Sequence, residues 1–171
     1  MRIKNPAITA DYVRSILEYD RETGAFWWKV YRANKAVAGS RAGCRSKSHG
    51  YIVIKINSLA VLAHRLAWLY MTGEWPAHEV DHRDLNRANN AWSNLRQATH
   101  GQNQSNGRPY RNNKTGLKGA YPHSRRPGKF IAKIRSNSVL TTLGVFDTAV
   151  AAHAAYVIAA EAKHGEFRRI T

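Results

Sequence analysis

The chain is organised around residues 80–106, which read VDHRDLNRANNAWSNLRQATHGQNQSN. A carboxylate and an imidazole, Asp81 and His82, directly follow the apolar Val80. A loop too rich in Asn, Asp and Arg to form part of a core comes next. Thr99 then has the side chain of a helix N-cap, because its hydroxyl can accept a hydrogen bond from the first helical turn. The pattern predicts a short strand, a polar loop and a helix that together carry a base, a carboxylate and two amides, Asn94 and Asn103.

In residue type, order and spacing, this stretch resembles the HNH (ββα-metal) nucleases, specifically the variant of phage-type homing endonucleases in which an Asn replaces the last His of the name. The resemblance implies that His82 is the catalytic base and that Asn94 holds its imidazole through a hydrogen bond. It further implies that Asp81 and Asn103 bind the metal and that the products carry 5′-phosphate and 3′-hydroxyl ends. His100 is the alternative to Asn103 if the register of the motif differs.

The residue types also suit phosphodiester hydrolysis on physical grounds. A neutral imidazole near its unperturbed pKa can accept a proton from water at neutral pH. A hard cation such as Mg²⁺ takes oxygen ligands from few protein groups and keeps several waters. Because an amide oxygen suits Mg²⁺ or Mn²⁺ better than Zn²⁺ or Ni²⁺, we expect a divalent metal, Mg²⁺ first and Mn²⁺ second.

The loop itself allows a simpler interpretation. Asn and Asp side chains commonly satisfy nearby backbone groups in turns. We adopt that interpretation for Asn86, Asn89 and Asn90, and expect Asp84 to brace the loop.

The charge of the chain indicates a polyanionic partner. The 171 residues carry a net charge of +16 and the pI is near 10.5. Lys and Arg outnumber Asp and Glu by 11 to 4 in residues 1–57 and by 12 to 3 in residues 108–171, while residues 58–107 have 4 of each. Two basic flanks around a neutral centre are what a nuclease needs, because the flanks can neutralise phosphates. We expect double-stranded DNA as the partner and a monomeric protein.

A single cysteine, Cys44, excludes an intramolecular disulfide and any Cys-rich zinc site. No signal peptide is recognised at the N-terminus, and no stretch approaches the roughly 18 apolar residues of a membrane span. The expected location is therefore intracellular, in the cytoplasm of a phage-infected bacterial host.

The residues before the motif predict a small αβ lobe. A helix is expected after Thr9, aromatic and apolar strands over residues 26–30 and 50–56, a buried helix over residues 62–71 that ends at Gly73, and a short strand over residues 78–80. Of Trp27 and Trp28, at least one is expected in the core. Within the second helix, a His-Arg pair at residues 64–65 is interpreted as support beneath the motif, as the resemblance implies.

Residues 32–50 combine basic residues with Gly and Ser and are expected to form a flexible loop. A solvated surface loop is one interpretation. The charge distribution favours the other, contact with DNA phosphates through Arg41, Arg45 and Lys47.

The residues after the motif predict a separate module of three strands, near residues 119–121, 129–134 and 141–146, and an alanine-rich helix from Thr148 to His164. The stretches KGAY, FIAKIR, LGVFDT and AAHAAY resemble the AP2/ERF-type DNA-binding domain, although Phe130 stands where that family usually has Trp. A sheet covered by one helix leaves its other face free for a DNA groove. The expected DNA contacts are Arg125, Arg126, Lys129, Lys133 and Arg135.

These observations predict an α+β protein. Residues 1–107 form the HNH nuclease domain with its motif at about 78–106, residues 108–113 are a linker, and residues 114–171 are the AP2-like module. The expected function is that of a metal-dependent, phage homing-type endonuclease that nicks double-stranded DNA. The alternatives are a catalytically inactive DNA-binding regulator and an RNA-binding or RNA-cutting protein, although the RNA-recognition aromatic signatures are missing.

Overall fold

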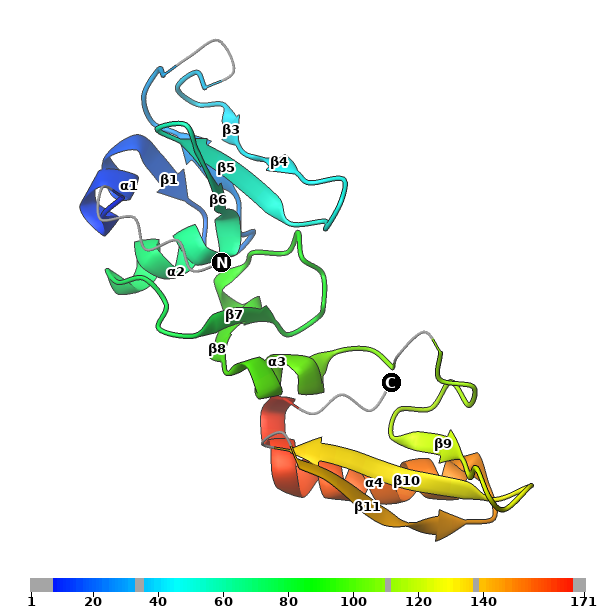
Figure 1. The fold of residues 1–171 in the computed structure, drawn as a ribbon. Coiled ribbons are helices and arrows are strands. Elements are labelled where there is room, and N and C mark those ends of the chain that lie inside the picture. The colour runs from blue at the N-terminus through cyan, green and yellow to red at the C-terminus, as the bar shows by residue number, and fades with distance from the viewer. Residues whose placement is uncertain (1–7, 33–35, 110–111, 137–138, 168–171) are drawn as a thin grey trace. The chain divides into compact units, whose positions relative to one another are not determined.

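The computed structural model describes residues 8–32, 36–109, 112–136 and 139–167. The chain divides into two compact units, residues 1–98 and residues 99–171. In the described residues the protein has four α-helices and several small antiparallel sheets (Figure 1), which confirms the predicted α+β class.

The first unit begins with the helix predicted after Thr9. Helix α1 spans Ala10–Ile16, and the Thr9 hydroxyl accepts a hydrogen bond from the backbone amide of Tyr12 at 3.2 Å. The chain continues into a three-stranded antiparallel sheet of β1 (Leu17–Tyr19), β2 (Phe26–Trp28) and β3 (Arg41–Ala42). One of the two neighbouring tryptophans is in the core, as predicted: Trp28 is 6% exposed and Trp27 is 39% exposed.

A second sheet follows, with the strand order β4 (Cys44–Arg45), β5 (Ile52–Ile56) and β6 (Leu59–Leu62). The prediction of a flexible loop over residues 32–50 is therefore wrong for Arg41–Ala42 and Cys44–Arg45. These short stretches pair with β2 and β5, and such pairing depends on partners elsewhere in the chain.

Helix α2 spans Ala63–Thr72 and ends at Gly73, which has a left-handed φ of 83° and donates its amide to Leu69 O. Both the buried helix and its glycine end were predicted from the sequence. Beyond it, β7 (Glu79–His82) and β8 (Leu95–Ala98) form an antiparallel hairpin, and the 3-10 turn η1 (Trp92–Asn94) lies in the connection between them.

One hydrophobic core joins these elements of the first unit. It contains Leu17 and Phe26 from the first sheet, Ile54 from the second and Leu66 from α2. Val80 of β7 and Leu95 of β8 belong to the same core, and the buried Leu95 is 5% exposed. Core residues in both strands thus anchor the β7–β8 hairpin. Asp81 and His82, which follow Val80, therefore lie on a strand that is packed into the core.

The second unit begins with α3 (His100–Asn106), whose N-terminus has a capping box. The Thr99 hydroxyl accepts from the backbone amide of Gln102, and the Gln102 side chain accepts from the backbone amide of Thr99 at 2.8 Å. Helix α3 packs against the 3-10 turn η2 (Gly165–Phe167), which is also part of this unit. The predicted linker at residues 108–113 stays a prediction.

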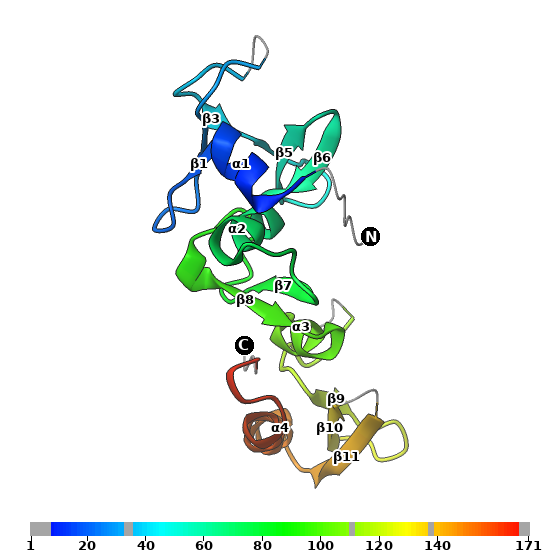
Figure 2. The same cartoon turned by 90° about the vertical axis from the view of Figure 1, so that its left-hand side faces the viewer.

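The rest of the second unit is a three-stranded antiparallel sheet of β9 (Ala120–Pro122), β10 (Phe130–Ser136) and β11 (Val139–Phe146), with β10 in the centre. Helix α4 (Ala149–His164) packs on one face of this sheet (Figure 2). The contact is made by small residues, because Ala120, Ala132 and Ala152 are fully buried. A small core of this kind brings the helix close to the sheet and leaves the other face uncovered by α4.

Candidate active site

Asp81 lies at the centre of the β7–β8 hairpin and forms a buried ion pair. Arg96 stands directly opposite it in the strand register. The Arg96 guanidinium contacts Asp81 Oδ2 through Nε at 3.0 Å and through Nη2 at 2.9 Å. Both side chains are nearly inaccessible, at 4% and 6% exposure. A metal held by Asp81 would therefore share this carboxylate with Arg96.

His82 ends β7 and is 4% exposed. Its Nε2 lies 3.0 Å from Oδ1 of Asn90 in the following loop. Because an amide oxygen only accepts, this orientation of Asn90 places the ring proton on Nε2 and the lone pair on Nδ1. The imidazole is thereby held in one tautomer, with Nδ1 as the nitrogen that can accept a proton.

The environment of His82 favours the neutral ring. Burial lowers the pKa of His82, and the hydrogen bond to Asn90 and the charges of Asp84 and Asp81 oppose that shift only in part. The nearby charge of Arg87 lowers the pKa further. A neutral imidazole at pH 7 is the form that a general base requires.

The hydrogen bond from Asn94 to His82 that the resemblance implied is not formed. The Asn94 amide instead donates to Asp84 Oδ1 at 2.9 Å and to Asn89 O at 2.8 Å, and its Oδ1 accepts from the backbone amide of Asp84 at 3.1 Å. Asn94 thus ties the two ends of the loop together. Asn90, which the sequence analysis treated as a loop-forming residue, is the amide that contacts the imidazole.

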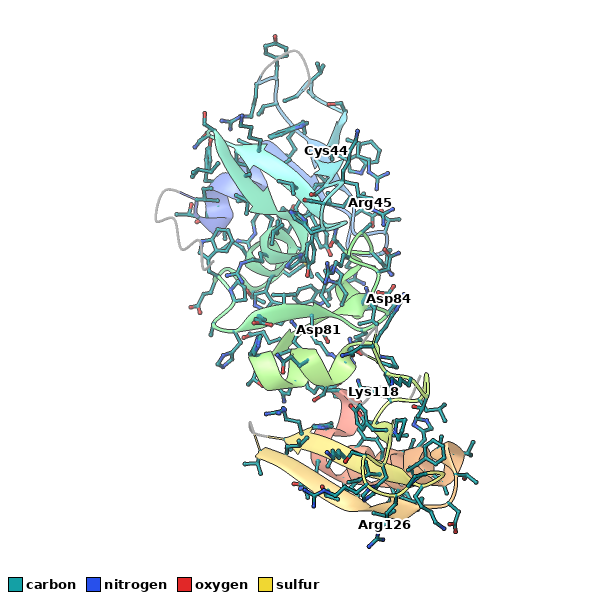
Figure 3. The ribbon with its side chains drawn as sticks, turned by 45° about the vertical axis from the view of Figure 1, so that its right-hand side comes forward. Cys44, Arg45, Asp81, Asp84, Lys118 and Arg126 are labelled. Atoms are coloured by element: carbon teal, nitrogen blue, oxygen red, sulfur yellow. The ribbon has the colours of Figure 1, made fainter. Side chains whose placement is uncertain are left out.

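The Asp84 carboxylate accepts three hydrogen bonds within the loop after β7. Its Oδ2 accepts from Asn89 Nδ2 at 2.7 Å, and its Oδ1 accepts from the backbone amide of Asn86 at 2.8 Å as well as from Asn94. Burial raises the pKa of Asp84, but these hydrogen bonds and the charge of His82 outweigh it, so that the pKa is lowered. Asp84 is therefore an ionised brace. Figure 3 shows Asp81 and Asp84 in the hairpin and its loop.

His64 of α2 packs directly on the candidate base. Its ring meets the ring of His82 edge-on at a centroid distance of 4.9 Å, and the centroid of the Tyr51 ring lies 5.0 Å from that of His64. Burial, followed by the charges of His82 and Arg65, lowers the pKa of His64 to about 3. Within the described residues its Nδ1 has no hydrogen-bond partner. His64 is a neutral packing partner that limits how the ring of His82 can tilt.

The segment that supports Asn90 comes from the N-terminal lobe. The Tyr19 hydroxyl donates to Asn90 O at 2.7 Å, and the backbone amide of Trp92 donates to Arg21 O at 2.8 Å. Gly24 has a φ of +73°, and a Cβ placed there would lie 2.1 Å from the carbonyl carbon of Asn90. Only glycine permits the turn at residues 20–24 to approach this closely.

Replacing Gly24 with alanine is therefore expected to destabilise the first unit by at least about 2 kcal/mol, because left-handed strain adds to a backbone clash. The displaced Asn90 should also lower cleavage by the protein. Gly73→Ala is the matched control, since Gly73 has a similar φ of +83° and open space around it. Urea unfolding followed by tryptophan fluorescence measures both variants, because all five tryptophans lie between residues 27 and 92. Equal stability of the two variants would contradict the close-approach argument.

The basic segment before β5 lies beside the candidate base. The turn between β4 and β5 is closed by a hydrogen bond from the Ser46 amide to Tyr51 O at 2.8 Å. It places the ring of Tyr51 at a centroid distance of 5.8 Å from His82. The predicted DNA contacts of this segment, Arg41, Arg45 and Lys47, are all exposed. The sequence did not show that this turn adjoins the motif.

The second proposed metal ligand, Asn103, lies on α3 in the second unit, whereas Asp81 lies in the first. His100, the alternative ligand, is on the same helix, and its Nε2 lies 2.9 Å from the side-chain nitrogen of Gln104. In the described residues no three His, Cys, Asp or Glu side chains are grouped as a metal site. The assignment of Asp81 and Asn103 as metal ligands stays a prediction.

The predicted DNA contacts of the second unit lie on its sheet. Arg125 and Arg126 are exposed in the connection between β9 and β10, and Lys129 is paired with Asp147. Lys133 and Arg135 alternate with Ala132 and Ile134, which are buried against α4. The same unit has a hollow of about 1100 Å³. Its lining includes no Asp or Glu in the described residues, and its Lys and Arg residues are Arg108, Lys118, Lys133, Arg135 and Lys163.

Comparison with known families identifies the central part of the chain. Residues 61–105 match the model of the HNH endonuclease family. The matched stretch contains α2, the β7–β8 hairpin and most of α3. No curated protein and no solved structure gave a match. The chain thus carries an HNH endonuclease domain in this region, and the family implies a phosphodiester hydrolase that acts on DNA. No helix in the described residues has the length and apolar character needed to cross a membrane.

Proposed function

We propose that this protein is a divalent-metal-dependent HNH endonuclease of the phage homing type that nicks double-stranded DNA. The observation that carries the proposal is the arrangement of His82, a buried and neutral imidazole held in one tautomer by Asn90, next to the carboxylate of Asp81. The family match over residues 61–105 supports a nuclease, and the charge of +16 supports DNA as its substrate.

In this proposal His82 accepts the proton of the attacking water through Nδ1, while Asn90 keeps the ring in place. Asp81 and Asn103 would hold the cation, with Mg²⁺ the first choice, as HNH nucleases generally use a divalent metal. Such a cation supplies charge neutralisation at the phosphate and at the departing 3′ oxygen. The products would then carry 5′-phosphate and 3′-hydroxyl ends.

The second unit is proposed to hold the DNA as an AP2-like module over residues 114–171. Its exposed Arg125 and Arg126, the basic face of β10 and the acid-free hollow support this role. Contacts of this kind release counterions and make binding depend on salt. A monomer with one active site would cut one strand per binding event, which is why nicking is proposed.

The alternative function is that of a catalytically inactive DNA-binding regulator. One observation favours it: Oδ2 of Asp81 already receives two contacts from Arg96. A cation would have to share this carboxylate or displace one of these contacts.

Incubation of supercoiled plasmid with the protein in Mg²⁺, in Mn²⁺ and in EDTA tests the proposal. We expect metal-dependent conversion to the open circle, with no conversion in EDTA. Competition between duplex DNA and duplex RNA separates the DNA and RNA alternatives. Binding without cleavage, across several metals and target sequences, would favour the regulator.

A further inference from the structure

The side of His82 that faces the β4–β5 turn is occupied by a group of rings and cations. The ring of Tyr51 lies 5.8 Å from that of His82, and the guanidinium carbon of Arg87 lies 4.9 Å from the Tyr51 centroid. His49 lies 5.5 Å from Tyr51 on the same turn. Arg87, in the loop that follows β7, and the candidate base His82 thus both contact the ring of Tyr51.

The guanidinium of Arg87 is fixed in position. Its Nη1 donates to His49 O at 3.1 Å, and its guanidinium carbon lies over the ring of Tyr51. These contacts tie the loop after β7 to the turn before β5 and use only one of the five N–H donors of the guanidinium. Because arginine is planar and pre-organised in this way, its remaining donors can bind an anion at little entropic cost.

No acidic partner neutralises Arg87 in the part of the chain that the structure describes. The nearest carboxylate in its loop, Asp84, accepts hydrogen bonds from Asn89 and Asn94 instead. A further cation lies close by: the Arg45 guanidinium is near Gly50, with Nη2 3.8 Å from the position of a Cβ there. Figure 3 shows Arg45 and Asp84 along the same edge of the first unit.

A fixed, exposed and uncompensated cation beside a general base is suited to an anion at the reacting centre. We infer that Arg87 binds the scissile phosphate of the DNA, through the guanidinium donors that His49 leaves free, and stabilises the negative charge that develops there. This inference rests on the proposed function and adds a catalytic residue to it. Arg45 contributes to the same phosphate-binding edge, and Tyr51 holds Arg87 at its distance from His82.

The test compares three variants of the full-length protein. Arg87→Met removes the charge and keeps a long side chain over Tyr51, and Arg87→Lys keeps the charge without the planar fork. Lys55→Met is the control, because Lys55 is an exposed residue of β5 with none of these contacts and its loss also removes one positive charge. Each is measured for single-turnover cleavage at saturating protein in Mg²⁺, for DNA binding in EDTA, and for thermal unfolding.

We expect Arg87→Met to lower the single-turnover rate by about 10²–10³-fold, as for removal of one charge-stabilising donor. DNA binding in EDTA should weaken only a few-fold. The slope of its salt dependence should fall by the amount expected for the loss of about one phosphate contact. Arg87→Lys should cleave at roughly a tenth of the wild-type rate. Lys55→Met should cleave at the wild-type rate.

Two results would overturn the inference while leaving the nuclease intact. One is a wild-type rate in Arg87→Met. The other is an equal loss of rate in the Met and Lys variants together with a lower melting temperature, which would make Arg87 a structural tie between the two loops. A wild-type protein that binds DNA and cuts nothing would overturn the proposed function, and the inference with it.

Discussion

Replacing His82 with alanine is expected to lower DNA cleavage by about 10²–10⁴-fold, the contribution typical of a positioned general base. The reason is specific to this site: His82 is the buried imidazole whose tautomer is set by Asn90. DNA binding should stay close to wild type, since the exposed basic residues are untouched. A plasmid-nicking time course and a binding titration in EDTA measure the two effects.

Two further variants distinguish loss of the base from misfolding of the protein. His82→Gln keeps much of the volume beside His64 and Tyr51, so that it avoids the cavity that alanine would leave. His78→Ala is the matched control, because His78 is exposed and lies four positions earlier on the chain. Wild-type cleavage in His82→Gln with normal folding would rule out His82 as the base.

The pH dependence of the cleavage rate is a second test of His82 as the general base. Because the pKa of His82 is lowered by burial, the folded protein should keep the neutral base as the pH falls through 6.5, the ordinary value for histidine. The cleavage rate should therefore decline only at a lower pH. The protonated ring is favoured in the unfolded chain, so stability that is present above pH 6.5 should also be lost as the pH falls below it.

The largest stability effect is expected at Arg96. Arg96→Met leaves the buried carboxylate of Asp81 without its partner, and the loss of one member of a buried ion pair costs about 3–5 kcal/mol. Both side chains are at most 6% exposed, so water cannot take the place of the guanidinium without reopening the hairpin. Urea unfolding of the first unit, followed by tryptophan fluorescence, measures the change in the free energy of unfolding.

The controls for Arg96 separate the charge from the packing. Arg21→Met breaks the exposed Arg21–Glu22 pair, whose side chains are 69% and 78% exposed, and should change stability by less than about 1 kcal/mol. The double variant Asp81→Leu/Arg96→Met removes both buried charges and should recover most of the loss. If it stays as unstable as Arg96→Met, the isolated charge is not the cause.

Much of the fold could be predicted because its signals are local. Thr9 and Thr99 begin helices with the side-chain caps that their residue types favour, and Gly73 ends α2 in a left-handed conformation. A strand over residues 78–80, directly before Asp81 and His82, was predicted from the sequence, and β7 extends through both of these residues. These features depend on a few neighbouring residues, and a single sequence contains that information.

The partner of His82 could not be predicted, because the loop offers four asparagines of the same chemistry. Which amide reaches the imidazole depends on turn geometry, including a positive φ of 63° at Leu85, and on the support of Asn90 from Tyr19. The strands at Arg41–Ala42 and Cys44–Arg45 were missed for a related reason, since two-residue strands form only where a neighbouring strand is already in place.

The support of Asn90 by the turn at residues 20–24 has a consequence for protein engineering. The HNH family match begins at residue 61, yet Tyr19, Gly24 and Tyr51 all lie upstream of it. A chimaera that transplanted only residues 61–105 into another scaffold would carry the proposed catalytic side chains, His82 and Arg87 among them. It would lack Tyr51, on which Arg87 stacks, and would leave Asn90 without the contacts that position it. A portable cassette therefore has to include Tyr19, Gly24 and Tyr51 as well.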